Sequence, residues 1–270
     1  MTTKRVHIRE LAGWDLDDYQ YRPLINGDKL LRARAFLQHR PAFTQLDPVC
    51  ASESHQLKDL LEPHASRSDL LEEMSGLSWT LGIVDLRSLI AFQRRLYFPQ
   101  EISHPLPPAA GDWPALIEHS FGTVKPPEFD KTHDPSRNTL VLRSDNPNTH
   151  IRMTNDATFP ITVHTGSPFF EVASYAGRWF LRDGYHRAYS LLKADIHHVP
   201  AVIINAETIE QVGANQPWFF PEKILFSQAP PLVTDFLEDD LVNEYDRPRL
   251  IRTLRLTIED TLVPESKAGE

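Results

Sequence analysis

Residues 178–205 constrain the fold of this chain more than any other stretch, because they predict a strand, a tight turn, a helix, a turn and a second strand. Asp183-Gly184 favours the first turn, since glycine adopts a positive φ without steric cost. Tyr185 to Lys193 is rich in helix formers, with apolar residues at helical spacing. Val199 to Ile204 is a short β-branched run typical of a buried strand. We therefore expect a small mixed sheet that delivers the Asp183-Gly184 turn at one edge.

Arg187 lies in the first turn of the predicted helix, where the free N–H groups and the helix dipole favour an anion. A cationic side chain at that end needs an explanation. One is a bound phosphate or carboxylate, which the planar guanidinium grips with two hydrogen bonds. The other is a surface arginine paired with a neighbouring acid such as Asp183. The first alternative makes Gly184, Tyr185, His186 and Arg187 a phosphate-binding turn.

His186 and Asp183 have both functional and structural interpretations. The ordinary pKa of histidine suits His186 as a general base, a metal ligand or a phosphate donor. The alternative is a structural role, in which His186 is hydrogen-bonded to the sheet. Asp183 is a candidate Mg²⁺ ligand or proton acceptor. The alternative is that Asp183 closes the turn and caps the helix.

Asp183-Gly184-Tyr185-His186-Arg187-Ala188, followed by a helix and a Val-Pro-Ala-Val-Ile-Ile strand, resembles the signature of the ParB/sulfiredoxin superfamily. The resemblance is close over about thirty residues and extends over the segment from Trp79 to Asn205. It implies a turn that binds the phosphates of a nucleotide. The branch most similar here is the nucleotide-dependent free-serine kinases, whose turn is Asp-Gly-x-x-Arg-like and which use an acid near the start of the domain as base. That implies Asp85 as base, whereas the residue pattern alone makes Asp85 a helix N-cap.

Two other branches of the superfamily fit the sequence less well. Sulfiredoxin needs a cysteine where this chain has Tyr185, which argues against sulfinic-acid reduction. The partitioning proteins have a Gly-Glu-Arg-Arg turn and a helix-turn-helix region, and we recognise neither here. The formal charge of −9 also argues against DNA as a partner, because phosphate backbones favour basic surfaces.

The remaining composition is that of a soluble globular protein without a membrane-spanning or signal-peptide run. The single cysteine, Cys50, excludes an internal disulfide framework and fits a reducing cytoplasm. His197-His198 is a tempting metal pair, but neighbouring residues entering a strand point to opposite faces, so we expect a structural role. We recognise no acid or cysteine cluster at the spacing of a zinc site.

The expected fold class is α+β, with a ParB/sulfiredoxin-like core, a helical N-terminal leader and a C-terminal extension. We assign residues 1–75 to the leader, 76–205 to the core with a Pro-rich insertion at 99–135, and 206–270 to an extension packed on the core. Further predictions are a strand at 79–84, a helix at 86–97, a hairpin between 161–164 and 169–175, and a strand at 249–259.

These observations lead to a cytoplasmic, nucleotide- or phosphate-binding protein that transfers or hydrolyses a phosphoryl group with Mg²⁺. Asp183, His186 and Asp85 are the catalytic candidates. One alternative is a non-catalytic regulatory protein that keeps the phosphate pocket, with a homo-oligomer or protein partner at the C-terminal segment. A second is a DNA-binding or nuclease protein, which follows from the family resemblance more than from this acidic chain.

Overall fold

A computed structural model describes residues 4–100, 106–146, 149–153, 161–257, 259 and 261–262. The remaining residues include parts of the predicted leader (1–3), Pro-rich insertion (101–105) and C-terminal extension (258, 260 and 263–270), which therefore lie outside the described residues. The chain forms two compact units. The core unit consists of Met1–Val124 and Ser167–Arg249, and the second unit of Lys125–Gly166 and Leu250–Glu270.

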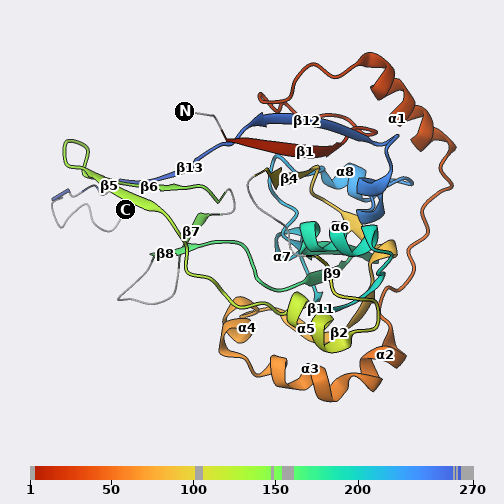
Figure 1. Cartoon of the computed structure of the whole chain (residues 1–270). Coiled ribbons are helices and arrows are strands. Elements are labelled where there is room, and N and C mark those ends of the chain that lie inside the picture. Colours follow the sequence, from red (N-terminus) through yellow and green to blue (C-terminus); the bar gives the residue numbers. More distant parts are fainter. Residues whose placement is uncertain are drawn as a thin grey trace. The chain divides into compact units, whose positions relative to one another are not determined.

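The structure is α+β, as predicted (Figure 1). The elements of the core unit are, in chain order, β1 (Arg5–Leu11), α1 (Gly27–His39), α2 (Ala51–Gln56), α3 (Lys58–Ala65), α4 (Ser68–Glu73), β2 (Ser78–Asp85), the 3₁₀ helix η1 (Leu86–Ser88), β3 (Ile90–Ala91), β4 (Arg95–Pro99), α5 (Trp113–Ser120), β9 (Glu171–Tyr175), β10 (Arg178–Asp183), α6 (Tyr185–Lys193), β11 (His198–Asn205), α7 (Ile209–Val212), α8 (Glu222–Leu225), the 3₁₀ helix η2 (Val233–Leu237) and β12 (Val242–Pro248). Those of the second unit are β5 (Asp130–Asp134), β6 (Thr139–Ser144), β7 (His150–Met153), β8 (Ile161–His164) and β13 (Arg252–Thr257).

A five-stranded mixed sheet in the order β2-β11-β9-β10-β3 forms the centre of the core unit. β11 is antiparallel to β2 and parallel to β9, and β10 is antiparallel to β9 and parallel to β3. α2 and α3 pack on β2, and α5 packs on β11. Apolar β-branched residues of β11 are fully buried, as expected for a strand covered on both faces. The predicted small mixed sheet is thus confirmed.

The predicted helix at 86–97 is wrong. The chain instead forms η1, β3 and β4. Leu86, Leu89, Ile90 and Leu96 are all fully buried, so the apolar pattern marks the core correctly but belongs to extended chain. Periodicity in such a short run does not separate a helix from buried strands. The deciding factor is strand pairing, because β3 pairs with β10 and β4 with β1.

The predicted hairpin between 161–164 and 169–175 is also wrong. β8 pairs with β7 in the second unit, whereas β9 pairs with β10 and β11 in the core unit. Gly166-Ser167-Pro168 is therefore not a hairpin turn, and the chain passes from the second unit to the core unit between Gly166 and Ser167. The second unit otherwise contains the three-stranded antiparallel sheet β13-β6-β5, whose β13 falls within the predicted strand at 249–259.

The predicted helical N-terminal leader contains the helix α1, but it begins with a strand. β1 is the middle strand of a three-stranded antiparallel sheet, β12-β1-β4. In β1 the apolar side chains of Val6 and Ile8 are buried and alternate with partly exposed His7 and Arg9, which is the period-2 pattern of a strand. Among the helices that the structure describes, none has both the length and the apolar character that crossing a membrane requires.

A buried ion network holds β1 against β4. Glu10 is 0 % exposed and accepts hydrogen bonds from Arg95 Nε at 2.7 Å and from Arg22 Nε at 2.8 Å. The Tyr245 hydroxyl of β12 donates to Glu10 Oε2 at 3.1 Å. Asp17 pairs with both arginines. Buried charges are tolerated only when each is paired with an opposite charge. Because Glu10 pairs with both Arg95 and Arg22, the network depends on Glu10.

We expect Glu10→Gln to lower the free energy of unfolding by about 3 kcal/mol, because it leaves two buried arginines short of a counter-charge. Chemical denaturation measures this loss. Glu244→Gln is the matched control: Glu244 pairs with Arg9 on the same sheet but is 46 % exposed, so the loss should stay within about 1 kcal/mol. Equal losses in the two variants would contradict a dominant role for the network.

Candidate functional site

The turn between β10 and α6 has the predicted conformation. Gly184 is left-handed, with φ +98°, and α6 begins at Tyr185. A Cβ on Gly184 would lie 2.8 Å from Cδ2 of Phe170, a ring that is fully buried. Glycine is therefore required here both for its backbone angle and for the close approach of Phe170. The predicted order of strand, turn, helix and strand over 178–205 is confirmed.

Asp183 faces a second carboxylate that sequence analysis missed. Asp183 and Glu171 are partners in the β10–β9 pairing, at a point where the register shifts. Glu171 is 1 % exposed and accepts hydrogen bonds from the Ser167 hydroxyl and the Arg182 guanidinium. Asp183 stays partly exposed, and its Oδ1 accepts the Gly184 N–H at 2.5 Å. We call Asp183 and Glu171 the carboxylate pair.

Burial raises the pKa of both carboxyl groups in the pair. For Glu171 it does so to about 7, opposed by the charge of Arg182 and reinforced by that of Asp183. For Asp183 burial also raises the pKa, opposed mainly by the charge of Arg187. Because the two carboxyl groups interact, they titrate as a coupled pair rather than independently. The pair is thus poised to accept or release a proton.

Arg187 lies beside the carboxylate pair, but its guanidinium is already engaged. It donates to four backbone carbonyls, those of Pro168 and Phe169 at 2.7 Å, His119 at 3.2 Å and Ser120 at 3.4 Å. It also lies 5.6 Å from the ring centre of Phe170. Burial lowers the pKa of Arg187, and the charges of Asp183 and Glu171 oppose that effect. The guanidinium therefore joins the end of α5 to the segment that leads into β9, and its contact with a ligand stays a prediction.

Tyr185 and His186 contact a different part of the core unit. The Tyr185 hydroxyl accepts the Phe92 N–H at 2.9 Å, and burial raises the pKa of this phenol. His186 Nε2 lies 2.9 Å from the carbonyl oxygen of Tyr97 in β4. This is the sheet-bound histidine that the sequence left as an alternative. The structure thus places Arg187 beside Asp183. The side chains of Tyr185 and His186 instead contact β4 and the segment between β3 and β4.

Asp85 lies far from the carboxylate pair. It is on β2, and the sheet order places β2 three strand spacings from β10, roughly 14 Å. Asp85 and Asp183 are therefore too far apart to act on one atom. The Asp85 carboxylate accepts the Arg87 N–H at 2.9 Å at the start of η1, which is the capping role expected from the residue pattern. Burial opposes ionisation, but hydrogen bonds from Arg87 hold the pKa of Asp85 below its usual value.

The residues around the turn do not fit a Mg²⁺ ion held by protein alone. Both Glu171 oxygens accept hydrogen bonds from side chains, and Asp183 accepts from the N–H groups of Gly184 and Ser167. Mg²⁺ needs an octahedron of free oxygen donors. Binding of Mg²⁺ by Asp183 would require these hydrogen bonds to break, and the chemistry proposed for this turn does not involve Mg²⁺.

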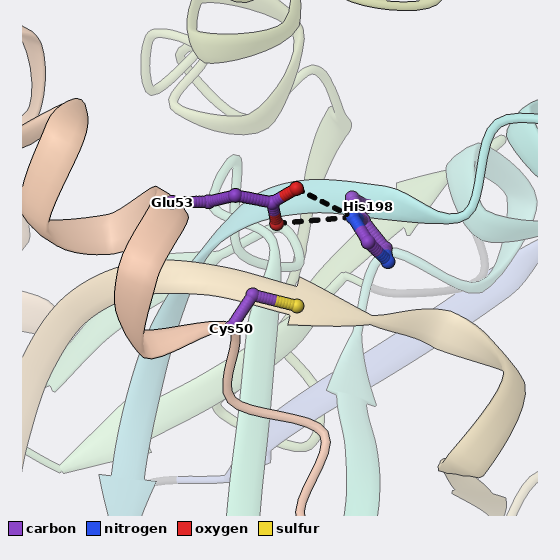
Figure 2. A group of neighbouring side chains, drawn as sticks. All are labelled: Cys50, Glu53 and His198. Atoms are coloured by element: carbon purple, nitrogen blue, oxygen red, sulfur yellow. Dashed lines mark hydrogen bonds and ion pairs between the residues drawn. The ribbon is translucent and has the colours of Figure 1, made fainter.

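The structure also joins residues that sequence analysis kept apart. Cys50, Glu53 and His198 offer ligand atoms that all lie within 4.8 Å of one another (Figure 2). The spacing of Cys50 and Glu53 places both on one side of a helical turn, so the sequence did indicate that these two side chains are neighbours. The approach of His198 depends on the pairing of β11 with β2, which no sequence spacing reveals. For Glu171, the available signal was a charged residue between the buried Phe170 and Val172.

No family model, curated protein or solved structure matches this chain. The resemblance to the ParB/sulfiredoxin superfamily therefore stays a prediction.

Gly184→Ala should destabilise the protein far more than Gly177→Ala. Both glycines are left-handed, so each substitution costs about 1–2 kcal/mol for the backbone. Nothing lies within 4 Å of a Cβ at Gly177, whereas at Gly184 the buried Phe170 must move, which adds about 1–3 kcal/mol. Urea denaturation of the two variants measures the difference, and similar losses would show that Phe170 relaxes freely.

The raised pKa of Glu171 predicts a pH dependence of stability. The folded protein holds this proton up to about pH 7, whereas the unfolded chain releases it near 4.5. Between these values the folded state binds more protons, so the free energy of unfolding falls as pH rises, by up to about 1.4 kcal/mol per pH unit. Glu171→Gln should flatten the slope measured by denaturation from pH 4.5 to 7. The control Glu222→Gln, on an exposed side chain, should keep it.

Proposed function

We propose that the protein binds a phosphorylated small molecule, with a nucleotide as the leading candidate, at the start of α6, and that Asp183 transfers a proton there. The observation that carries this proposal is the carboxylate pair Asp183–Glu171, which lies beside two arginines at a helix N-terminus. Strongly perturbed carboxyl groups are concentrated at functional sites.

The charges around the turn favour an anionic ligand. When the carboxylate pair holds one proton, it contributes one negative charge, while Arg182 and Arg187 contribute two positive charges. The charge of Glu73 also acts on Glu171, which brings this local sum to about zero, so the positive end of the helix dipole at the first-turn amides of α6 is what favours an anion. The side chain of Arg182 is 21 % exposed, so its charge is accessible to a ligand.

Asp183 is the proton acceptor in this proposal because it is the less buried member of the pair. Burial raises the pKa of Asp183 toward neutral pH, and a general base is most effective when its pKa lies near the working pH. An attacking hydroxyl group or water would pass its proton to Asp183, and the negative charge of Glu171 would favour the protonated form of Asp183. Arg187 acts as a positioning residue, since it fixes the segment that leads into Glu171.

A ParB/sulfiredoxin-like core is part of the same proposal. Its support is the strand–turn–helix–strand order over 178–205 and the mixed sheet around it. The resemblance to nucleotide-dependent kinases suggests phosphoryl transfer or hydrolysis as the reaction. A regulatory protein that senses the same ligand without turnover is the main alternative, and it shares the binding step.

Thermal-shift measurements with inorganic phosphate, ATP, ADP, CTP and GTP, each with and without Mg²⁺, test the binding step. One or more of these ligands should stabilise the wild type by about 2.7 kcal/mol at one hundred times its Kd. Arg187→Gln should abolish the shift. Arg178→Gln is the matched control. Like Arg187, Arg178 donates to backbone carbonyls, three in its case, but it lies at the other end of β10. The thermal shift caused by the ligand should therefore persist in Arg178→Gln.

Absence of any shift in the wild type, or an equal shift in Arg187→Gln, would overturn the proposal. Arg182→Gln replaces Arg187→Gln if the latter does not fold. Phosphate release separates enzyme from sensor: Asp183→Asn should keep ligand binding but lose turnover. Stabilisation by duplex DNA alone would instead support the DNA-binding alternative.

A further inference from the structure

Three side chains with metal-binding chemistry converge at one end of the five-stranded sheet. Cys50 directly precedes α2, Glu53 lies in the first turn of α2, and His198 is the first residue of β11. Figure 2 shows the Glu53 carboxylate and the His198 ring facing each other, with the Cys50 sulfur directed into the same space. All three residues are partly buried, and their ligand atoms lie within 4.8 Å of one another.

The backbone positions of these residues are fixed by the sheet. The Cys50 N–H donates to the Ile83 carbonyl of β2 at 2.9 Å. The Ser54 hydroxyl of α2 accepts the Ile83 N–H at 2.8 Å. His198 is the antiparallel partner of Asp85 at the end of β2. The convergence therefore arises from paired strands and a tethered helix, which hold ligands more precisely than a free loop does.

The hydrogen bonds within the cluster are incomplete. His198 Nδ1 lies 3.0 Å from both oxygens of Glu53, and a single N–H does not satisfy both. Glu53 Oε2 is buried and accepts no hydrogen bond. The Cys50 thiol lies 3.6 Å from the Pro48 carbonyl oxygen and also interacts with the Glu53 carboxylate. A Glu53–His198 ion pair leaves Glu53 Oε2 without a well-placed donor, whereas a cation between the three groups would engage all of them.

The charges around Cys50 are negative. Burial raises the pKa of the Cys50 thiol to about 12, and the carboxylates of Glu53, Asp85 and Asp47 add to this effect. A thiol facing three acids is a poor nucleophile, which argues against a catalytic cysteine. The same surroundings attract a cation, which removes the thiol proton when it binds.

We propose that Cys50 Sγ, a Glu53 carboxylate oxygen and His198 Nδ1 bind one divalent transition-metal ion, Zn²⁺ by preference, with water as the fourth ligand. A sulfur, nitrogen and oxygen donor set selects zinc over Mg²⁺. Ligand atoms around a tetrahedral zinc ion lie roughly 3.5 Å apart, so small side-chain rotations close the site. Three protein ligands with an open position are typical of reactive rather than structural zinc.

Asp85 has a supporting role in this site. Its Oδ2 lies 3.8 Å from His198 Nε2, on the opposite side of the ring from Glu53. A carboxylate in that position orients a metal-bound imidazole by accepting its other N–H. Asp85 is itself held by Arg87 at 2.7 Å, which keeps it out of the fourth ligand position. The metal site is independent of the function proposed for the α6 turn.

Cobalt substitution tests the site directly, because Cys50 is the only cysteine in the chain. Tag-free protein stripped with a chelator is titrated with Co²⁺, followed by near-ultraviolet absorption. A thiolate-to-cobalt charge-transfer band can then come only from Cys50. We expect one Co²⁺ per chain, displaced by stoichiometric Zn²⁺ and unaffected by excess Mg²⁺.

Substitutions assign the ligands. Cys50→Ser should abolish the band, and His198→Gln should weaken Zn²⁺ binding at least tenfold in calorimetry. Asp85→Asn should keep the band but weaken binding roughly 10- to 100-fold. His197→Gln is the control, since His197 is the adjacent residue and pairs instead with Asp195 at 3.2 Å. Absence of the band in the wild type, or zinc binding as tight as in the wild type in either Cys50→Ser or His198→Gln, would overturn the proposal.

Discussion

The hydrogen bonds of the Arg187 guanidinium are the interaction on which the core unit depends most. One side chain from the first turn of α6 satisfies carbonyl groups at the end of α5 and in the segment that enters β9. Carbonyl groups left without donors in a buried place cost free energy comparable to a lost hydrogen bond each. The position of Glu171, the next residue but one after Phe169, follows from this attachment.

The burial of charge in this protein follows a consistent rule. Glu10, Glu171 and Asp235 are each about 1 % exposed or less, and each accepts hydrogen bonds from an arginine. Burial raises the pKa of Asp235 as well, opposed by Arg40. Arginine suits this role because it stays protonated and presents several donors in one plane. For Glu171, the charge of the neighbouring Asp183 raises the pKa further.

The sequence predicted correctly those features that are determined by residues close together in the chain. The order of elements over 178–205 and the left-handed Gly184 both depend on turn chemistry and periodicity within a few residues. The failures involve long-range pairing. Residues 86–97 became strands because β1 and β10 were available as partners, and residues 161–164 paired with β7 rather than β9. The partners of Asp183 and Cys50 were missed for the same reason, since strand register brings Glu171 and His198 to them.

The order of strands in the sheets also bears on how the chain is made. β1 is the middle strand of its sheet, yet its residue Glu10 meets Tyr245, 235 positions later. Thr139 of β6 likewise meets Thr257 of β13, 118 positions later. At about 5–20 residues per second of synthesis, β1 exists for ten seconds or more before β12 can pair with it. During that interval one edge of β1 offers unpaired N–H and C=O groups to any other extended chain. The protein is therefore most exposed to aggregation while it is being synthesised.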